Sequence, residues 1–428
     1  MKTEQASPLC GRRVLVAVSG SIAAVKTPML VSALVKAGAE VRCLVTSSGA
    51  ALVSPVALAS LSRHRCYLEK DQWDPAASRP LHIELAEWAE LTIVAPLSAS
   101  SLARWSQGSA DGLLASVLLA TEGPVIAAPA MNTAMWLHPA VQRNWQQIQD
   151  FPGVVPLLPE SGLLACDRVG DGRMVDPMLI ELAASSVFSR GPGSPVATLD
   201  WSQMSVLVSA GPTQEAIDPA RFLSNRSSGR MGVLLAQAAR FRGATVHLVH
   251  GPLDLPDALL EGLQCTPARN AAELSSALQR ALPSADVLVM TAAVADLRRD
   301  VAPEHKVAKQ ELQAALSSGW AEVPDLLAHL SGQCRPEQLV LGFSALTGDD
   351  THLLERAESK RLAKGCDLMM VNPVDREGQG FGDQPNGGWL LGNGWSRELP
   401  VTAKLSLANQ LLDALLNARD QAAASMES

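Results

Sequence analysis

The chain alternates short apolar runs with longer segments of helical periodicity. In the first 185 or so residues the apolar runs lie at 14–19, 41–46, 91–97, 125–130 and 154–158. Helical patterns between them include 22–37, 98–120 and 133–149. Continuous apolar strands that alternate with helices are typical of a parallel sheet covered on both faces. The pattern therefore predicts a doubly wound α/β domain over residues 1–188.

A stretch rich in Gly, Pro and Ser follows at residues 189–203 and is predicted to be a linker, although an ordinary long loop would have the same composition. The alternation then starts again, which predicts a second doubly wound, Rossmann-like domain over 204–420. Its apolar runs lie at 206–211, 245–251, 286–293, 338–345 and 367–372. Its helical patterns lie at 229–242, 270–282, 324–331, 350–364 and 403–419. A hairpin is expected around 387–394, and residues 421–428 are expected to form a frayed tail.

Composition narrows the class of protein. The 428 residues are 47% hydrophobic and 18% charged, which is enough apolar material for packed cores. The formal net charge of −8 and the aromatic content of 4% argue against nucleic acid as a partner. No window offers the roughly 20 apolar residues of a membrane span. Arg12 and Arg13 precede an apolar run, but Ser19–Ser21 interrupt it, so export is not expected and a cytoplasmic location is predicted.

The cysteines and histidines do not form metal-binding motifs. Seven cysteines are scattered and include no CxxC pair, which indicates a reducing compartment rather than a disulfide framework or a structural zinc site. His247 and His250 lie three apart in a predicted strand. They would face opposite sides of the sheet and could not chelate one metal.

Three predicted strand ends in the first domain are rich in small and hydroxyl residues. Gly20 and Ser21 follow the first strand, Thr46 follows the second, and Ser98 follows a later one. Ligands of open α/β sheets collect at such ends, and a helix N-terminus there favours a phosphate. Any tight strand-to-helix turn also favours Gly and Ser, so the signal is weak at each site and stronger for the set.

Three residues in the first domain have candidate reactivity. His82 lies in LHIELA, Asn132 in APAMNTAMW, and Cys166 in the Gly-rich segment SGLLACDRVGDGRM. Each also has an ordinary explanation: a surface histidine, a helix cap, and a buried inert cysteine.

The ordered set GSIAAVK, LHIELA, PAMN and SGLLAC…GDGRM, which spans about residues 12–190, resembles the flavin-containing cysteine decarboxylases. Within them it is most similar to the phosphopantothenoylcysteine decarboxylases. The resemblance implies FMN, with its phosphate at turns such as those of Ser21 and Ser98. It further implies that His82 is catalytic, that Asn132 binds the substrate's cysteine carboxylate, and that Cys166 donates a proton from a mobile flap.

The implied chemistry is coherent. A carboxylate of this type loses CO₂ poorly because the carbanion has no electron sink. A flavin can take a hydride equivalent from the thiol-bearing carbon, the resulting thioaldehyde accepts the electrons of decarboxylation, and the enethiol is then reduced by the same flavin. One residue departs from the family: Asp167 stands where the family has Gly. Asp tolerates positive φ better than most residues, and its charge would disfavour a thiolate at Cys166.

The segment SAGPTQEAIDPARFLSNRSSGRMG, residues 209–232, is the most distinctive in the second half. Asn225 begins a polar run of small residues immediately before a predicted helix. Such a run can donate N–H and hydroxyl groups to phosphates, although it could also be a well-capped helix start. Farther along, Asp296, Lys306 and Lys309 would suit a triphosphate and its Mg²⁺, or would simply form a solvated loop.

Two further features follow. Gly342 and Phe343 are predicted to end a strand, and Lys360 and Lys364 share one face of a predicted helix. Together with the long motif, AAVAD, the lysine loop and VPD, they resemble the phosphopantothenate–cysteine ligases over about residues 204–418. The full chain thus resembles the bifunctional enzymes of coenzyme A biosynthesis that join both activities.

The ligase resemblance implies CTP as co-substrate. The carboxylate of 4′-phosphopantothenate attacks the α-phosphate to give an acyl-cytidylate, and the amine of cysteine then displaces CMP. Asn225 would act on the acyl-cytidylate, and Lys306, with Lys309 as the neighbouring candidate, would serve amide formation. Asp296 would bind the metal. The implied nucleotide-binding residues are Ala292, Ala293, Asp296, Lys306, Lys309, Pro324, Asp325, Phe343, Lys360 and Lys364.

Two departures accompany this second resemblance. Leu346 replaces a family acidic residue, and the lysine loop is one residue longer than expected. The resemblances also imply a homo-oligomer, with flavin domains in trimers that build a dodecamer and ligase domains in dimers. Two other functions stay open at this point: a flavin-binding regulatory protein with a degenerate site, and a ligase whose flavin half is only a scaffold.

Overall fold

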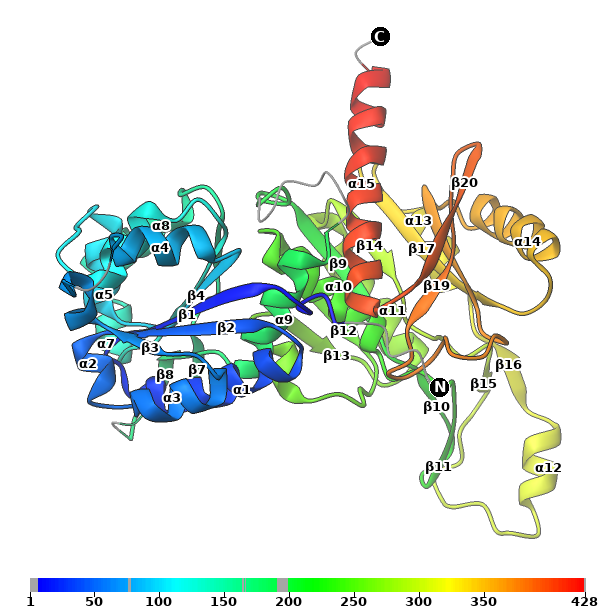
Figure 1. The fold of residues 1–428 in the computed structure, drawn as a ribbon. Helices are drawn as coiled ribbons and strands as arrows, with labels where there is room; N and C mark the ends of the chain where they lie inside the picture. Colours follow the sequence, from blue (N-terminus) through cyan, green and yellow to red (C-terminus); the bar gives the residue numbers. More distant parts are fainter. Residues whose placement is uncertain (1–6, 76–77, 164, 166, 191–198, 427–428) are drawn as a thin grey trace. The chain divides into compact units, whose positions relative to one another are not determined.

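The computed structural model describes residues 7–426 except 76–77, 164, 166 and 191–198, and side chains as far as residue 421. The chain separates into two compact units (Figure 1). The first comprises Met1–Asp200 together with Phe241–Gly243 and Asp257–Gly262, and the second comprises the remainder.

The first unit is built on a parallel sheet of six strands in the order β3-β2-β1-β4-β5-β6. The order reverses between β1 and β4, which makes the sheet doubly wound, as predicted. The strands are β1 (Arg13–Val18), β2 (Glu40–Val45), β3 (Cys66–Leu68), β4 (Leu91–Leu97), β5 (Val125–Pro129) and β6 (Val154–Pro156).

Alternate residues of each strand enter two separate cores, because successive side chains face opposite sides of a sheet. Val14 and Val16 pack with α1, α3 and α9, whereas Leu15 and Ala17 pack with α4, α5, α6 and α8. Both faces are covered, which is why the strands read as continuous apolar runs. The helices are η1 (Ile22–Lys26), α1 (Thr27–Lys36), α2 (Ser47–Ala50), α3 (Pro55–Ser62), η2 (Glu69–Trp73), α4 (Leu81–Trp88), α5 (Ala99–Ser106), α6 (Leu113–Ala120), α7 (Thr133–Trp136), α8 (Pro139–Gln149), α9 (Pro177–Phe188) and, from later in the chain, η3 (Asp257–Leu260).

The predicted helices and strands need several corrections. The helix expected at 98–120 is two helices, α5 and α6, separated by a turn in which Gly108 has a φ of 69°. The helix expected at 133–149 is likewise divided, because Pro139 starts α8. The sequence did not predict β3, nor the antiparallel hairpin of β7 (Glu160–Leu163) and β8 (Val169–Arg173), which has no apolar run.

The second unit contains a sheet of eight strands in the order β13-β12-β9-β14-β17-β18-β19-β20. The first six are parallel and follow the same winding as the first unit, and the predicted hairpin adds β19 and β20 antiparallel. The strands are β9 (Ser205–Ala210), β12 (Thr245–His250), β13 (Gln264–Pro267), β14 (Val287–Met290), β17 (Leu339–Leu346), β18 (Leu368–Pro373), β19 (Asn386–Gly392) and β20 (Trp395–Thr402).

Helices cover this sheet as well. α11, α13 and α14 share one apolar core with the strands, and α15 contacts β17, β19 and β20. The helical elements are α10 (Arg230–Phe241), α11 (Ala271–Ala281), η4 (Leu282–Ser284), α13 (Leu326–Ser331), α14 (Asp350–Ala363) and α15 (Lys404–Met426). The expectation of a frayed tail from 421 was wrong as far as Met426, because α15 continues to that residue. Trp201, expected in the linker, is fully buried.

An arm lies apart from the main sheet of the second unit (Figure 1). It consists of β10 (Gln214–Asp218), β11 (Arg221–Ser224), β15 (Leu297–Arg299), α12 (Leu312–Ser317) and β16 (Trp320–Glu322). β10 pairs with β11 and β15 with β16, and β10 contacts β15. Because the arm follows the ends of β9 and β14, it extends from the carboxyl edge of the sheet.

Candidate active sites

A cavity of about 330 Å³ opens at the carboxyl edge of the first sheet, where the strand order reverses. The segments that line it follow β1, β2 and β4. Three predicted turn residues, Gly20, Thr46 and Ser98, are brought together there, and Ser21 is the neighbour of Gly20. The other lining residues are Ser47, Ser48, Glu69, Ser100, Ser101, Arg104, Asp111 and Gly112.

Hydrogen bonds fix the shape of this cavity. The hydroxyl of Thr46 accepts from the backbone N of Gly49 at 3.1 Å, and that of Ser98 accepts from the N of Ser101 at 3.3 Å and caps α5. Gly20 admits no side chain, because a Cβ would lie 2.4 Å from the Cβ of Ser48. A rigid, hydroxyl-lined pocket beside the start of α5 fits a phosphate.

Asn132 lies beneath the β7–β8 hairpin. Its Oδ1 accepts from the N of Ala134 at 2.9 Å and caps α7, so the capping interpretation is correct. The backbone N of Met131 donates to the O of Gly172 at 2.9 Å, and a Cβ on Gly172 would lie 2.2 Å from the O of Met131. The hairpin therefore packs directly on the segment that carries Asn132.

The proposed acid stands between β7 and β8 in the sequence. Cys166 itself lies outside the described residues. Asp167 is described, and its φ of 59° lies in the left-handed region. The position therefore has the conformation that a glycine would adopt without cost, as the family sequence suggested.

His82 occupies a different place. It is the second residue of α4, half-buried, and it lines a pocket of about 300 Å³ with Gln72, Trp73, Asp74, Ser78, Arg79 and Pro80. The structure thus gathers the turn residues in one pocket and sets Asn132 against the hairpin. Among the described side chains, His82 does not line the pocket of Gly20, Thr46 and Ser98.

Asn225 holds a loop at the carboxyl edge of the second sheet. Its Nδ2 donates to the backbone O of Ala293 at 3.2 Å and of Val294 at 3.0 Å. Other polar side chains secure the same loop: the hydroxyl of Ser209 accepts from the N of Ala292 at 3.1 Å, and that of Thr213 accepts from the N of Ala295 at 3.0 Å. The predicted residues Ala292 and Ala293 are consequently fixed beside Asn225.

Charged residues distant in sequence converge next to this loop. Lys364 lies 3.3 Å from the carboxylate of Asp325, which follows the exposed Pro324 and caps α13. Burial lowers the pKa of Lys360, with Lys364 and Arg356 adding to the effect, while Asp296 and Asp325 oppose it. Asp296, Asp325, Lys360 and Lys364 therefore form one electrostatic cluster.

Phe343 lies in the middle of a strand, so the expectation that it ends one was wrong. β17 continues to Leu346. The neighbouring strand β14 ends at Met290, which pairs with Gly342. Phe343 is thus the first residue of β17 beyond the end of β14, and it is half-exposed. Lys360, whose Nζ lies 3.4 Å from the hydroxyl of Ser344, reaches the following residue.

The loop that carries Lys306 and Lys309 is anchored by residues that the sequence did not single out. Both lysines are exposed. Between them, the N of Val307 donates to Asp218 at 3.2 Å, and Arg221 lies 3.2 Å from the same carboxylate. Desolvation would raise the pKa of Asp218, but hydrogen bonds from Ala220 and Val307 and the charge of Arg221 hold it below its usual range. The DPxR pattern of Asp218 and Arg221 was the available signal.

A cavity of about 420 Å³ lies beside this anchor. Its lining includes Gln214, Glu215, Asp218, Arg221, Arg269, Arg298 and Arg299. Among the described residues, no three His, Cys, Asp or Glu side chains are grouped to hold a metal ion. Asp296 would therefore need phosphate or water oxygens as further ligands to bind Mg²⁺. No helix in the described part of the chain is long and apolar enough to cross a membrane.

Comparison with known proteins agrees with this division. The family model described as Flavoprotein matches residues 2–182, and that of the DNA/pantothenate metabolism flavoprotein C-terminal domain matches 201–418. The coenzyme A biosynthesis bifunctional protein CoaBC of Bacillus subtilis is 39% identical over 94% of this chain and 96% of its own length. The chain belongs to this family of bifunctional coenzyme A biosynthesis proteins.

CoaBC of Escherichia coli is 35% identical over 96% of this chain and 98% of its own length. A solved structure of the FMN-binding protein AtHal3 is 36% identical, covering 40% of this chain and 92% of that chain, with a TM-score of 0.36. As a member of the CoaBC family, the protein is an enzyme of coenzyme A biosynthesis with decarboxylase and ligase activities.

Proposed function

We propose that the second unit joins 4′-phosphopantothenate to cysteine with CTP, and that the first unit decarboxylates the product to 4′-phosphopantetheine. The observation that carries the proposal is the convergence of Asp296, Asp325, Lys360 and Lys364 beside the loop bound by Asn225. Two lysines and two carboxylates are the groups that a nucleoside triphosphate and its divalent cation require.

In the proposed ligation, Lys360 and Lys364 bind the phosphates of CTP and Asp296 binds Mg²⁺. The substrate carboxylate attacks the α-phosphorus and pyrophosphate leaves, which forms the acyl-cytidylate. The amine of cysteine then attacks the acyl carbon and CMP leaves. Asn225 keeps the 292–295 loop against the intermediate, and the loop anchored by Asp218 brings Lys306, or Lys309, to the departing phosphate.

In the proposed decarboxylation, FMN supplies reversible two-electron oxidation of the substrate when it is bound. The pocket of Gly20, Thr46 and Ser98 fits its phosphate, since hydroxyls line it and a Cβ at Gly20 would fill it. Asn132 binds the substrate carboxylate beneath the hairpin, and Cys166 delivers a proton to the product carbon. His82 is the catalytic histidine by family resemblance, and its separate pocket supports a site completed by another subunit.

The proposed domains are a decarboxylase at 1–188, a linker at 189–203 and a ligase at 204–420. The proposed location is the cytoplasm, where the described cysteines would stay reduced.

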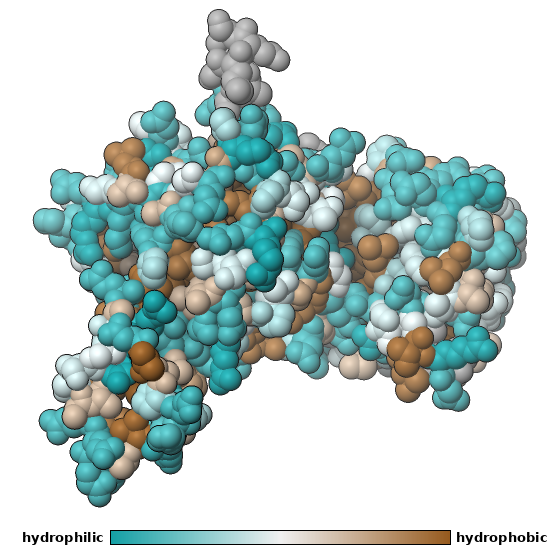
Figure 2. Space-filling model, turned by 180° about the vertical axis from the view of Figure 1, so that it is seen from behind, coloured by the Kyte–Doolittle hydropathy of each residue, from teal (hydrophilic) through white to brown (hydrophobic). Residues whose placement is uncertain are grey.

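Exposed apolar residues support the proposed homo-oligomer. On one face of η1 and α1, Ile22, Val25 and Met29 are 56%, 56% and 66% exposed, which would suit trimer contacts of the flavin domain. Figure 2 shows apolar patches on the arm of the second unit, at the lower left, and its residues Phe222 and Val301 are 48% and 79% exposed. The arm would suit a ligase dimer, and the trimers would build the dodecamer.

A single-pot assay tests the proposal. Purified protein is given 4′-phosphopantothenate, cysteine, CTP and Mg²⁺, and the products are read by mass spectrometry. Formation of 4′-phosphopantetheine with loss of CO₂ is expected. Accumulation of the ligated amide would support the ligation step and contradict the decarboxylation step. Absence of any amide would contradict the ligation step. Replacing CTP with ATP tests the nucleotide, and Cys166→Ser should stop product completion while flavin stays bound.

A further inference from the structure

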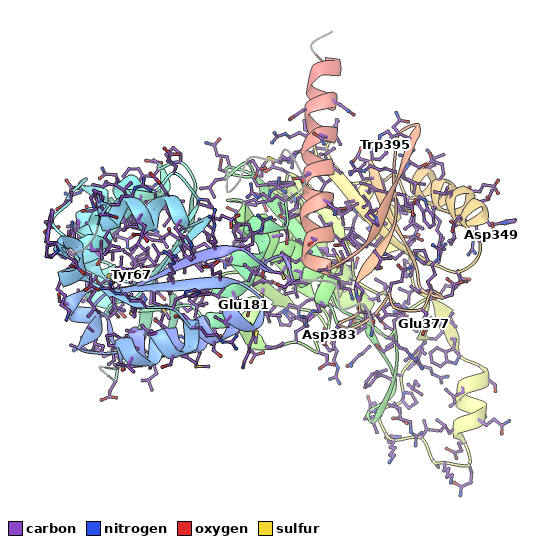
Figure 3. The ribbon with its side chains drawn as sticks, in the orientation of Figure 1. Tyr67, Glu181, Asp349, Glu377, Asp383 and Trp395 are labelled. Carbon is purple, nitrogen blue, oxygen red and sulfur yellow. The ribbon has the colours of Figure 1, made fainter. Side chains whose placement is uncertain are left out.

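The loop between β18 and β19, residues 374–385, lies at the carboxyl edge of the second sheet. Gln379 and Gly380 are buried in it, whereas Phe381 and Asp383 are exposed. Gly378, Gly380 and Gly382 have φ values of 82°, 128° and 64°, and no atom lies within 4 Å of a Cβ built on any of them. Three alternating glycines in the left-handed region give the loop unusual backbone freedom. Figure 3 labels two of its acidic residues, Glu377 and Asp383.

Several charged contacts hold this loop. Near its start, Arg376 pairs with Asp350, and the carboxylate of Asp375 accepts from the backbone N of Gly348 at 3.0 Å. Two more contacts hold its later part. Lys404, the first residue of α15 and only 7% exposed, donates from its Nζ to the backbone O of Gly380 at 2.8 Å and of Gly382 at 2.6 Å. Next along the loop, the carboxylate of Asp383 lies 2.9 Å from the guanidinium of Arg230, the first residue of α10. The side chain of Asp383 is 86% exposed, so the contact is at the surface.

Positive charge is concentrated at this point. Arg230 and Lys404 each begin a helix, where the positive end of the helix dipole disfavours a cation. Burial, followed by the nearby charge of Arg230, lowers the pKa of Lys404 to about 8, while Asp383 opposes both. Two cations thus face one exposed carboxylate. Exposed ion pairs are weak, whereas a phosphate can form several charge-assisted hydrogen bonds with the same groups.

We propose that Asp383 gates the ligase site: in the substrate-free enzyme its carboxylate occupies the position on Arg230 that a substrate phosphate takes during the reaction. Arrival of the phosphate displaces Asp383, and the glycines let the loop move while Lys404 retains it. This inference rests on the proposed function, because it takes the incoming group to be a phosphate of 4′-phosphopantothenate or of CTP. Asp383 is a positioning residue that acts through Arg230.

The test is Asp383→Asn in the full-length enzyme. The variant removes the competing charge but keeps the size of an exposed side chain, so folding should be unaffected. The KM for one phosphorylated substrate should fall by about fivefold, and inorganic phosphate should bind about fivefold more tightly by calorimetry, with kcat unchanged. A fall confined to 4′-phosphopantothenate identifies its monoester as the displacing group, and a fall confined to CTP identifies the triphosphate.

Glu377→Gln is the matched control. It makes the same charge change on the same loop, at an exposed residue for which the described structure shows no ion pair. It should leave both KM values and phosphate binding unaltered. An equal change in the two variants would show that the effect comes from net charge alone and would overturn the proposal. Unchanged KM values and phosphate binding in Asp383→Asn would overturn it as well. Absence of ligation in the parent enzyme would contradict the proposed function instead. The comparison of phosphate binding between the parent and Asp383→Asn would still test whether Asp383 competes with phosphate for Arg230.

Discussion

The two units wind their parallel strands in the same order but build their carboxyl edges from different groups. In the first, neutral hydroxyl residues directly follow β2 and β4: Thr46 and Ser98 are only 8% and 9% exposed. In the second, Asp296, Lys306 and Asp383 are charged and exposed. The common winding determines where a ligand collects, and the residues after each strand determine which ligand.

The two kinds of edge suit ligands that stay bound for different times. Hydroxyls fixed by caps, in a pocket that Glu69, Arg104 and Asp111 also line, offer a rigid cradle, which suits a cofactor that remains bound. Charged side chains on anchored loops suit anions that enter and leave in each cycle, because exposed charge pairs form and break at little cost. Four substitutions test this contrast.

The largest effect is expected for Asn225→Asp. A carboxylate would face the backbone oxygens of Ala293 and Val294, which now accept hydrogen bonds from the amide, and the loop would be repelled. Ligation should fall by about 100-fold, the order expected for the loss of interactions worth about 3 kcal/mol. The CTP-dependent assay measures it, and the flavin spectrum should not change. Asn393→Asp, in the exposed turn between β19 and β20, is the control, and normal ligation in Asn225→Asp would remove Asn225 from the site.

Gly20→Ala should act on the other unit alone. The added methyl would lie 2.4 Å from the Cβ of Ser48, and relief of such overpacking costs about 1–3 kcal/mol. FMN should bind at least about tenfold more weakly, seen as loss of flavin absorbance in the purified protein, while ligation is retained. Gly332→Ala, where the nearest atom is 3.4 Å away, should keep its flavin. Full flavin content in Gly20→Ala would mean that the cofactor binds elsewhere.

Lys404 should give the charged site a pH dependence that the hydroxyl site lacks. With a pKa of about 8, against an ordinary 10.5, Lys404 loses its charge as pH rises through about 8. Phosphate affinity should then fall, so the KM of the gated substrate should rise by about threefold from pH 7 to 9. Between pH 8 and 10.5 the unfolded chain binds more protons than the folded one, so this residue makes folding stability increase with pH. Lys404→Gln should flatten both trends, and a retained KM profile would exclude Lys404 as their source.

The smallest effect is expected for Asp167→Gly. Asp167 holds a left-handed backbone conformation, which costs a non-glycine residue about 1 kcal/mol. Glycine adopts the same conformation without that cost. Decarboxylation should be preserved or raised by no more than about twofold, measured as CO₂ release. Arg63→Gly is matched, since Arg63 has a φ of 61° at the end of α3, far from the hairpin in sequence. A large loss in Asp167→Gly alone would show that the Asp167 carboxylate itself takes part.

The sequence was sufficient to predict the strands that are buried on both faces, such as β1 and β9, because their apolar runs have no other explanation. It was insufficient for the two-stranded elements β7–β8, β10–β11 and β15–β16, which are short, polar and stabilised by each other. Candidate residues that follow the strands could be found because the apolar runs show where each strand ends. Asp218 and Asp383 were missed because their roles arise from contacts with Val307 and Arg230, 89 and 153 residues away.

The two edges of the second sheet bear on aggregation. β20, the outer strand of the hairpin, is largely exposed and carries Arg397, Glu398 and Pro400, while β13 on the opposite edge has only four residues and ends at Pro267. Charged side chains and prolines on an edge strand, or a very short edge strand, discourage the addition of a further strand from another molecule. Neither edge is suited to open-ended growth into fibres, so self-association is directed to surfaces where it can stop at a defined number of copies.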